Sequence, residues 1–406
     1  MIEIKGRYNS AKIFATTVEN GVKEQVLEML NLKAFENYKI RIQADTHSGK
    51  GCVIGFTATN IDKVVPNTLS VDLSCGMLAF NLGKEDIDLE KLDKFIRNKI
   101  PHGTSINQNI QTEFINESLI NGIRYIAEKT DSDYEKHLRA IGSLGSGNHF
   151  LEVNVNNITN EKYIVVHTGS RNFGHRIATY HQNKAVEYCK IKSKEFNDNR
   201  NKRIGLLKQQ GRHNEIQAVF EEVNIYDVPK HLAFLEGELM EDYFRDIKIA
   251  NEFAIANRET IINNICKFLN RSYSNSELLS IHTIHNYFDG TTIRKGSISA
   301  MKDEIVLIPI NMRDGSIIAK GKGNIEYNNS APHGSGRLMS RTKAKAEVNL
   351  DDFKESMKDV YTSSVNENTI DESPFAYKDI TEIINNTKDT IEILHIIKPI
   401  YNFKSN

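Results

Sequence analysis

The chain of 406 residues contains no tryptophan, only seven prolines and only four cysteines. The cysteines are Cys52, Cys75, Cys189 and Cys266, and no two of them form a C-x-x-C pair. Cysteines this sparse cannot form the disulfide framework of a small secreted protein. Most isolated cysteines are small buried apolar side chains, and this is our expectation for Cys189 and Cys266.

Long apolar runs are also lacking. No segment approaches the roughly 18–20 apolar residues that a membrane-spanning helix needs. The N-terminal sequence MIEIKGRYNS has no basic segment followed by an apolar one, as a secretory signal would. We therefore expect no membrane association and a reducing, cytoplasmic environment.

The charge of the chain is nearly balanced, with a formal net charge of −1, but its distribution is uneven. Residues 290–345 contain ten Lys and Arg against four Asp and Glu, whereas residues 346–406 contain six against twelve. This asymmetry is compatible with a basic active-site surface beside an acidic flank, and also with ordinary surface charge.

Hydrophobic periodicity favours an α+β fold with a strand-rich mixed core. Apolar residues recur at helical spacing over 18–31, and short apolar segments at 40–44, 69–73, 163–167 and 281–284 are typical of strands. Strands are also expected at 305–310 and 316–319. The tail from 373 to 404 is expected to form two helices followed by a strand. Residues 177–270 are rich in Lys, Glu, Gln, Asn and Leu and almost free of Pro and Gly. We expect a single domain, 1–406, with 177–270 as a helical insertion that breaks near Asp227-Val-Pro229.

Several of the expected strands are followed by side chains that can bind metals, next to glycine or asparagine. The set contains one carboxylate, one thiol and three imidazoles, namely Asp72, Cys75, His149, His167 and His285. Each alone is more often structural, but such residues collect at loops that a scaffold holds in place. A thiolate with imidazoles favours Zn, Fe or Co, and the carboxylate admits Mn. A thiolate can also bridge two metals, which suits phosphate chemistry.

A second group of polar residues surrounds His333. This histidine opens the turn His333-Gly-Ser-Gly-Arg337, and Arg341 follows eight residues after it. Amides of small residues can hold phosphate oxygens, and arginine forks match them. If a helix begins here, the two arginines share one side of it. His333 is therefore a candidate nucleophile for a phosphoryl group, although a plain phosphate-binding turn would have the same pattern.

These segments, taken in order, resemble the RtcB family of RNA-splicing ligases over nearly the whole chain. ADTHSGKGCVIG (44–55) and VDLSCGM (71–77) resemble the first motifs of that family. SLGSGNHFLEV (143–153), VVHTGSRNFGH (165–175), IHN (284–286), RKG (294–296) and HGSGRLMSR (333–341) follow. DESPFAYKD (371–379) and a lysine near the C-terminus complete the series, while LEGELMEDYF (235–244) and FAIANR (253–258) resemble the helical part.

The resemblance implies a role for individual residues. Cys75 would bridge two Mn²⁺ ions, with Asp72, His149, His167 and His285 as the other ligands. His333 would be the nucleophile that takes GMP from GTP. Arg171 and Arg337 would contact phosphate or RNA, and Asp45 and His47 would lie near the site. The residues expected around the nucleotide are Asn148, His149, Phe150, Leu151, Glu152, His285, Asn286, Pro309, Ile310, Asn311, Met312, Ser316, His333, Gly334, Ser335, Gly336 and Lys404.

The implied activity is GTP-dependent joining of RNA ends in RNA repair or tRNA splicing. A 3′-phosphate, or a 2′,3′-cyclic phosphate once opened, would accept GMP from His333. The 5′-hydroxyl of the second RNA would then attack and expel GMP. The implied partners are GTP and RNA with these ends, and the sequence leaves open whether an activating protein takes part.

Three departures from the family pattern look like a subfamily signature. The family often has I-P-G-S-M where this chain has Ile308-Pro-Ile-Asn-Met312, in a loop expected to touch the nucleotide. Family chains commonly end in Lys-Gly, whereas Lys404 is followed here by Ser405 and Asn406. Asn172 stands where glycine is usual.

Two other functions fit part of the pattern. A metal-dependent phosphoesterase acting on cyclic-phosphate RNA ends would need the metal ligands but no nucleotide-carrying His333. A non-enzymatic RNA-binding protein would need neither Cys75 nor His333, and its affinity would fall steeply with salt.

Overall fold

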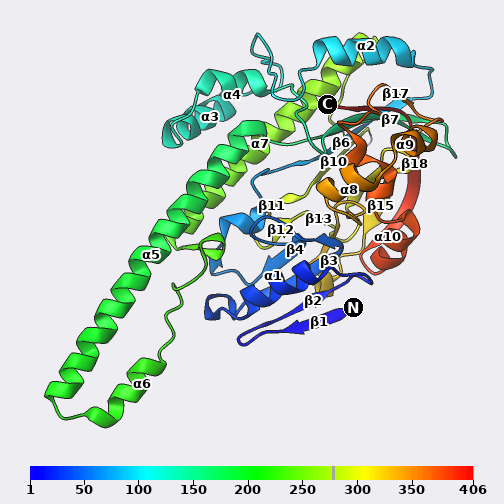
Figure 1. Cartoon of the computed structure of the whole chain (residues 1–406). Helices are drawn as coiled ribbons and strands as arrows, with labels where there is room; N and C mark the ends of the chain where they lie inside the picture. The colour runs from blue at the N-terminus through cyan, green and yellow to red at the C-terminus, as the bar shows by residue number, and fades with distance from the viewer. Residues whose placement is uncertain (277–278, 406) are drawn as a thin grey trace.

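The computed structural model describes residues 1–276 and 279–405, and most of its strands belong to two large sheets (Figure 1). The first sheet has six strands in the order β1 (Ile2–Lys5), β2 (Ser10–Ile13), β3 (Lys39–His47), β4 (Ile54–Thr59), β12 (Ile293–Lys295) and β11 (Asn286–Phe288). Strands β2 and β3 are parallel, and the other neighbours in this sheet are antiparallel.

The second sheet has eight strands. Its main path is β10 (Ser280–Ile284), β6 (Gly76–Gly83), β8 (Lys162–Thr168), β7 (Phe150–Asn156), β18 (Ile391–Lys404), β15 (Gly315–Gly321) and β14 (Ile305–Asn311), and β17 (Tyr361–Thr362) pairs with β18. Two short ladders join β13 (Ser297–Ser299) to β16 (Ser330–Pro332) and β5 (Lys63–Val64) to β9 (Leu235–Glu236). The sequence-based expectation of a strand-rich α+β core is confirmed.

One residue, His285, lies where the chain passes from one large sheet to the other. Strand β10 of the second sheet ends at Ile284, and strand β11 of the first sheet begins at Asn286. The His285 amide donates to the carbonyl of Cys75, and the Ser297 amide donates to the carbonyl of His285. The backbone at this crossing is therefore fixed by hydrogen bonds on both sides.

Ten α-helices lie in the described parts of the chain. They are α1 (Asn20–Leu30), α2 (Leu89–Lys99), α3 (Glu117–Lys129), α4 (Tyr134–Ala140), α5 (Arg171–Gln209), α6 (Ile216–Glu221), α7 (Glu238–Phe268), α8 (Arg341–Glu347), α9 (Leu350–Ser356) and α10 (Ile380–Thr387). Helix α7 contributes to two cores: Phe253 and Ala256 pack with α1, α3 and α5, whereas Ile261, Ile262 and Ile265 pack under the second sheet. None of the helices in the described parts of the chain has the length and apolarity that a membrane span requires.

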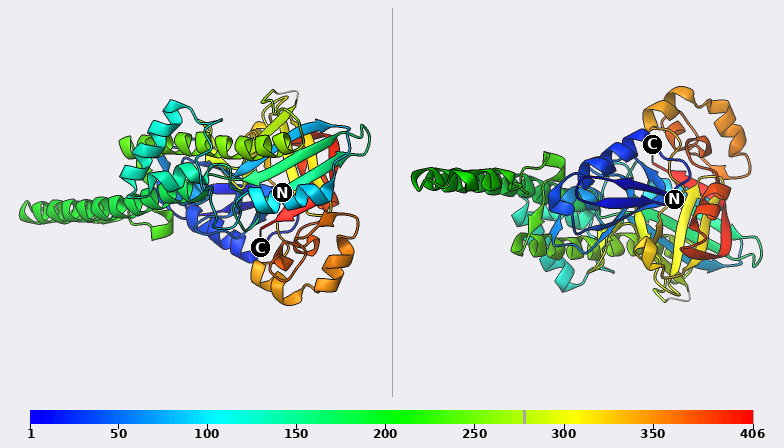
Figure 2. Two further views of the ribbon diagram at one scale, coloured as in Figure 1. Left: turned by 90° about the horizontal axis from the view of Figure 1, so that it is seen from above. Right: turned by 90° about the horizontal axis from the view of Figure 1, so that it is seen from below.

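Helix α5 extends far beyond the body of the molecule. Its 39 residues correspond to a rod of about 58 Å. Figures 1 and 2 show that α6 lies beside its far end, and that the chain returns from there toward α7. The helical character expected for 177–270, including a break near Asp227, is confirmed, although the first helix begins earlier, at Arg171.

Three local predictions are wrong. Residues 69–73 are not a strand: a 3-10 helix covers Pro66–Leu69, and a turn follows in which Ser70 and Ser74 have φ of 75° and 58°. Leu69 and Leu73 are still buried, so the apolar signal reflected core packing and not an extended backbone. The turn after His333 does not start a helix either, because α8 begins only at Arg341 and Arg337 forms a β-bridge with Tyr377. In the tail, the first expected helix is a short 3-10 turn, Pro374–Ala376.

Lys295 anchors the glycine-rich loop that follows β3. Its side chain is 2% exposed, and Nζ donates to the carbonyls of Lys50, Cys52 and Asn67 at 2.9 Å each. Burial lowers the pKa of Lys295. Three carbonyl acceptors thus surround one buried ammonium group, which holds the loop against strand β12.

We expect Lys295→Met to lower the free energy of unfolding by roughly 3 kcal/mol, because three buried carbonyls lose their donor. Lys302→Met, at an exposed position, should change it by less than about 0.5 kcal/mol. Urea denaturation followed by circular dichroism measures both variants. Equal stability of the two variants would show that the buried ammonium does not hold the loop.

Candidate active site

Five side chains that can bind metals converge at the junction of the two sheets. The Cys75 Sγ lies 3.4 Å from His149 Nε2 and 3.2 Å from His167 Nε2. The Nε2 atoms of His167 and His285 are 3.4 Å apart, and His149 Nε2 is 3.1 Å from Asp72 Oδ2. All five of the predicted ligands therefore meet at one place, although they come from four separate segments of the chain.

The five side chains form two overlapping sets of potential ligands. Asp72, Cys75 and His149 make one set, and Cys75, His167 and His285 make the other; within each set the ligand atoms lie within 4.8 Å of one another. Cys75 belongs to both sets. The geometry therefore suits two ions that share one sulfur atom.

Hydrogen bonds to carbonyl groups fix the tautomers of two of the histidines. His149 Nδ1 lies 2.9 Å from the carbonyl oxygen of Leu144, and His167 Nδ1 lies 3.2 Å from that of Asn148. Because a carbonyl oxygen only accepts, each Nδ1 must carry the proton. Each Nε2 therefore directs a lone pair at Cys75, which is the arrangement that metal-binding histidines have.

Burial shifts the pKa values of the imidazoles and of the thiol in opposite directions. It lowers the pKa of His167 and of His285 well below the usual value, and neighbouring histidines lower them further, so both imidazoles are neutral at pH 7. Burial, with the nearby Asp72 carboxylate, raises the pKa of the Cys75 thiol. Neutral imidazoles, a thiol and a carboxylate fit Mn²⁺, Zn²⁺, Fe²⁺ or Co²⁺ by donor type.

Most of the ligands stand beside strands, but not always after them as predicted. His167 is near the end of β8 and His285 follows β10, whereas Cys75 directly precedes β6 and His149 directly precedes β7. The strands β6, β7 and β8 are antiparallel neighbours, so the start of one strand lies beside the end of the next. Phe150 pairs with His167 across β7 and β8, which places His149 and His167 at the same edge of the sheet.

Two buried polar residues of α7, Asn257 and Arg258, hold the ligand-bearing loops together. Asn257 Oδ1 accepts from the amides of Gly142 and Ser143, and its Nδ2 donates to the carbonyl of Gly169. Arg258 Nη1 donates to the carbonyls of Ser74 and Thr168. The sequence analysis assigned neither residue a function, although a polar Asn-Arg pair within the apolar segment FAIANR was a signal that could have been used.

His333 lies beside the cluster, on a segment packed against the first sheet. Its Nδ1 is 2.6 Å from Asp45 Oδ2, and its backbone amide donates to the same oxygen at 3.1 Å. The ring centroids of His333 and His285 are 4.7 Å apart. The Asp45 carboxylate is fully buried and accepts from Nδ1, so Nε2 of His333 keeps its lone pair.

Gly336 allows this approach of the two segments. Its φ is +71°, and a Cβ at this position would lie 2.5 Å from the carbonyl oxygen of Asp45. A larger residue would therefore push the His333 segment away from strand β3. Ser335 fixes the segment on its other side, because its hydroxyl donates to the carbonyl of Ile310 at 2.7 Å.

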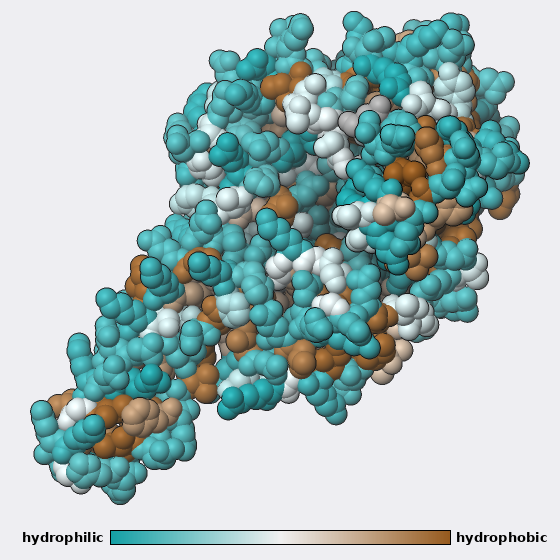
Figure 3. Space-filling model, in the orientation of Figure 1, coloured by the Kyte–Doolittle hydropathy of each residue, from teal (hydrophilic) through white to brown (hydrophobic). Residues whose placement is uncertain are grey.

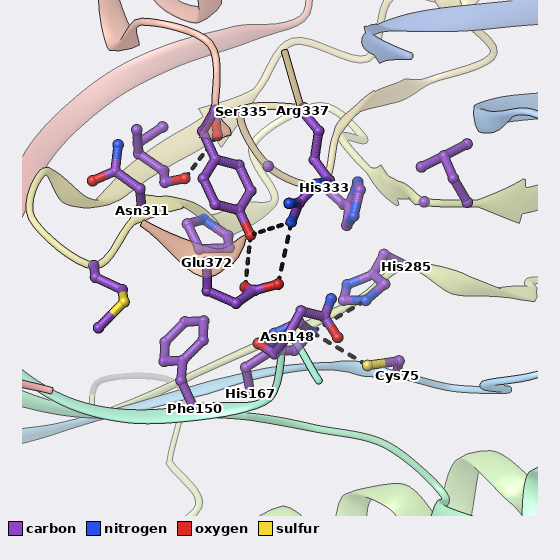
Figure 4. Close-up of a pocket in the computed structure, with 18 of the residues that line it drawn as sticks. Cys75, Asn148, Phe150, His167, His285, Asn311, His333, Ser335, Arg337 and Glu372 are labelled. Carbon is purple, nitrogen blue, oxygen red and sulfur yellow. Dashed lines mark hydrogen bonds and ion pairs between the residues drawn. The ribbon is translucent and has the colours of Figure 1, made fainter. Parts of the chain in front are cut away.

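A cavity of about 310 Å³ extends from the metal-ligand cluster past His333, which is the size of a small-molecule site (Figure 3). Figure 4 shows Glu372 between Arg337 and Phe150, and Lys404 Nζ contacts both the Glu372 carboxylate and the Phe150 ring. The candidate residues that line it are Asp72, Cys75, Asn148, Phe150, Glu152, His167, His285, Asn286, Pro309, Ile310, Asn311, Met312, His333, Gly334, Ser335, Gly336, Arg337 and Lys404.

A compact cluster of charges surrounds Glu372 on the wall of this cavity. Its carboxylate accepts from Lys404 Nζ at 2.8 Å, from Arg337 Nη1 at 3.2 Å and from the Tyr377 hydroxyl at 2.7 Å, and it pairs with Arg341 at 2.8 Å. Burial alone would raise the pKa of Glu372, but Lys404 and Arg341 lower it to about 2. The sequence analysis assigned no role to Glu372 or Tyr377.

The comparisons with known proteins agree with this geometry. Residues 25–405 match the family model described as "tRNA-splicing ligase RtcB". The chain belongs to the RtcB family. It is 28% identical to the RNA-splicing ligase RtcB of Escherichia coli K12, across 94% of each chain, and 24% identical to the tRNA-splicing ligase RtcB of Thermococcus kodakarensis, across 94% of this chain and 90% of the relative. The chain is therefore a member of a family of RNA ligases.

Four candidate residues of this RtcB-family chain do not line the cavity. His149 lies in the metal-ligand cluster, Leu151 packs in the core under the second sheet, and Ser316 is fully buried in β15. The Arg171 guanidinium donates to the carbonyl of Gly103 and the hydroxyl of Ser143. This candidate phosphate-binding side chain is therefore already hydrogen-bonded within the protein. Asp45 and His47 do lie near the site: Asp45 contacts His333, and His47 lines the cavity.

Two of the three departures from the family pattern lie at the cavity wall or next to it, whereas Asn172 is exposed on helix α5. Ile310, Asn311 and Lys404 all line the cavity, and Asn311 Nδ2 donates to Asp314 Oδ2 at 2.8 Å. Ser405 is buried, and Asn406 lies outside the described residues. Asn311 thus places a side-chain amide in the loop 308–312, at the position of the serine hydroxyl in the I-P-G-S-M pattern.

Divalent metal affinity should rise about tenfold per pH unit between pH 6.5 and 8.5, because binding must displace one proton from the Cys75 thiol. His167 and His285 add no such dependence, since their lowered pKa values leave them neutral throughout this range. Titration with Co²⁺, followed by its absorption, measures the slope.

Cys75→Ser should abolish most of this pH dependence and weaken binding at least about 100-fold. Cys189→Ser, which changes a thiol outside the cluster, should keep the slope of the unmodified protein. An unchanged slope in Cys75→Ser would remove Cys75 from the ligand set.

Proposed function

We propose that this chain joins RNA ends in a GTP-dependent reaction, in RNA repair or tRNA splicing in the cytoplasm. The ends would be a 3′-phosphate or 2′,3′-cyclic phosphate on one RNA and a 5′-hydroxyl on the other, with a covalent His333–GMP intermediate. The observation that carries the proposal is the Asp45–His333 pair, which stands beside a metal-ligand cluster in a cavity of mononucleotide size.

His333 would act as the nucleophile. Because Asp45 accepts a hydrogen bond from the Nδ1–H group, the lone pair on Nε2 is available to attack the α-phosphorus of GTP. A P–N bond forms, the bond to the β-phosphate oxygen breaks, and pyrophosphate leaves. The ring becomes cationic as the bond forms, and the buried Asp45 carboxylate 2.6 Å away stabilises that charge.

Two Mn²⁺ ions, held by Asp72, Cys75, His149, His167 and His285, would supply positive charge for the phosphate oxygens on which negative charge develops. Hydrogen bonds within the protein hold these side chains and their loops in position. The Nδ1 hydrogen bonds of His149 and His167 orient their rings, and Arg258 holds the loops on either side of Cys75. The same site would serve every stage of the reaction, since each stage takes place at a phosphate.

Phe150 and Tyr377 supply aromatic faces for a purine base in the same cavity. Glu152 lies there as a buried carboxylate, with Asn402 and Asn154 donating to its two oxygens at 2.8 and 3.2 Å. A carboxylate accepts hydrogen bonds but does not donate them, so it can pair with both the N1–H and the 2-amino group of guanine, whereas adenine offers it only the 6-amino group beside the acceptor N1. This chemistry would explain a preference for GTP.

The RNA steps would follow at the same place. Water opens a cyclic phosphate to a 3′-phosphate, an oxygen of which attacks the phosphorus of His333–GMP and releases the histidine. The 5′-hydroxyl of the second RNA then attacks the activated 3′-phosphorus and expels GMP, giving a phosphodiester. Arg337 at the cavity wall is a candidate for phosphate contact, provided that it exchanges its bond to Glu372 for one to the substrate.

Radiolabelled GTP with Mn²⁺ should label the protein covalently, and His333→Ala should remove the label completely. Asp45→Asn should slow labelling about 100-fold or more, because the amide can donate to Nδ1 and favours the wrong tautomer. Denaturing electrophoresis separates the labelled chain from free nucleotide. His47→Ala, which changes a cavity residue without a bond to His333 Nδ1, is the matched control and should lose less activity than Asp45→Asn.

A metal-dependent phosphoesterase would give a different result. It would open cyclic-phosphate ends without covalent labelling, and His333→Ala would leave that hydrolysis intact. This outcome would replace the ligase proposal.

The affinity for GTP should fall as the pH drops below about 7, because burial raises the pKa of Glu152 to about 7 and protonation removes an acceptor. Glu152→Gln should abolish this pH dependence and reduce the preference for GTP over ATP by about 100-fold, which corresponds to two hydrogen bonds to a charged group. Equilibrium binding of both nucleotides from pH 6 to 8.5 measures the effect. If Glu152→Gln keeps the preference for GTP over ATP, the guanine base does not bind at Glu152.

A further inference from the structure

One face of the projecting helix α5 has an unusual composition. At 3.6 residues per turn, nine of its side chains lie within a sector of about 60° that runs along the whole helix. We call this face the basic stripe; it consists of Asn172, Arg176, Thr179, Asn183, Lys190, Lys194, Asn197, Asn201 and Lys208. The stripe contains four cations, four amides and one hydroxyl, and no acidic, aliphatic or aromatic side chain.

The stripe is open to solvent along a rod that stands away from the body of the molecule (Figure 2). Eight of its nine residues are exposed, and only Asn197 is half-buried. From Asn172 to Lys208 it spans about 54 Å of helix. The nearest acidic residues of the helix, Glu187 and Asp198, lie on its flank, about 20–40° outside the sector.

The four cations of the stripe are not neutralised within the described residues, where no carboxylate oxygen lies within 4.0 Å of their charged nitrogens. On the other faces of the arm, by contrast, Lys192 pairs with Glu195 and Arg203 pairs with Glu222. The positive charges of these unpaired side chains repel one another, so binding of a polyanion along the stripe is favourable.

The composition of the stripe fits a phosphate backbone. Lysine and arginine contact phosphates, while amides and hydroxyls contact phosphate and sugar oxygens, and none of these contacts depends on base sequence. Aromatic side chains, on which unpaired bases would stack, are missing from the stripe. A rigid rod of this length therefore suits a base-paired RNA stem better than a flexible single strand.

The position of the stripe relates it to the candidate active site. Asn172 stands five residues after His167 of the metal-ligand cluster, so the rod begins at the site and leads away from it. We propose that the basic stripe of α5 binds the phosphate backbone of a base-paired RNA stem that flanks the ends to be joined. This inference rests on the proposed function and deepens it, since it concerns which RNA the site receives.

The test compares two double variants of equal charge. Lys190→Glu/Lys208→Glu changes the stripe, and Lys192→Glu/Lys202→Glu changes two cations on other faces of the same helix. The probe is a hairpin RNA with a stem of roughly 16 base pairs, and its binding is measured by fluorescence anisotropy without GTP at about 50 to 200 mM salt. We expect the stripe variant to raise the dissociation constant about tenfold and to lower the salt slope by about two. The control variant should stay within about twofold of the unmodified chain.

Equal weakening in the two variants would show that only total charge matters, and would overturn the proposal. Unchanged binding of the hairpin by the stripe variant would also overturn it, and would leave an acidic protein as the alternative ligand of the arm. Self-labelling with GTP, measured on the unmodified chain, separates these outcomes from failure of the proposed function. Far-ultraviolet circular dichroism verifies that the arm remains helical in both variants.

Discussion

The convergence of three imidazoles, a thiol and a carboxylate at the junction of the two sheets is the constraint on which the rest of the site depends. Nitrogen lone pairs directed at one another and at a thiol, about 3.2–3.4 Å apart, repel unless a cation or a proton lies between them. The fold imposes this arrangement from several directions. Asn257 and Arg258 tie the loops around β6, β7 and β8 to helix α7, and His285 is fixed at the crossing between the sheets. A cation bound by the cluster would relieve this repulsion, and its donor set can hold one.

The two sheets contribute different halves of the chemistry. Most of the candidate metal ligands stand on or beside strands of the second sheet, whereas strand β3 of the first sheet carries Asp45, which bonds His333. Because His285 joins the sheets and its ring lies 4.7 Å from that of His333, the crossing also sets the position of His333 relative to the cluster. The charged cluster around Glu372 closes the other side of the cavity, where Arg337 and Arg341 pair with its carboxylate. Helix α5 starts directly beside this site and extends its unpaired cations outward.

Much of this could be predicted from the sequence, because the chemical identity of the residues carries the information. The thiol, the carboxylate and the three histidines were expected to meet, and they do; the long helices of 177–270 were visible in composition. The error at residues 69–73 has a physical cause. Apolar residues such as Leu69 and Leu73 report burial, but whether the backbone is extended there depends on tertiary packing that holds Ser70 and Ser74 in the left-handed region. The roles of Arg258, Glu372 and Tyr377 are likewise tertiary, since each acts through partners far away in the chain. No local pattern reveals that Glu372 meets Lys404, or that Arg258 reaches the loop of Cys75.

The most direct test of this account is a crystal structure of the protein grown with Mn²⁺ and GTP, with anomalous scattering used to locate the metal. The account predicts two manganese peaks about 3.5–4 Å apart on either side of the Cys75 sulfur, and continuous density from His333 Nε2 to a phosphorus atom. A single ion that does not touch Cys75, or a nucleotide bound away from His333, would contradict it.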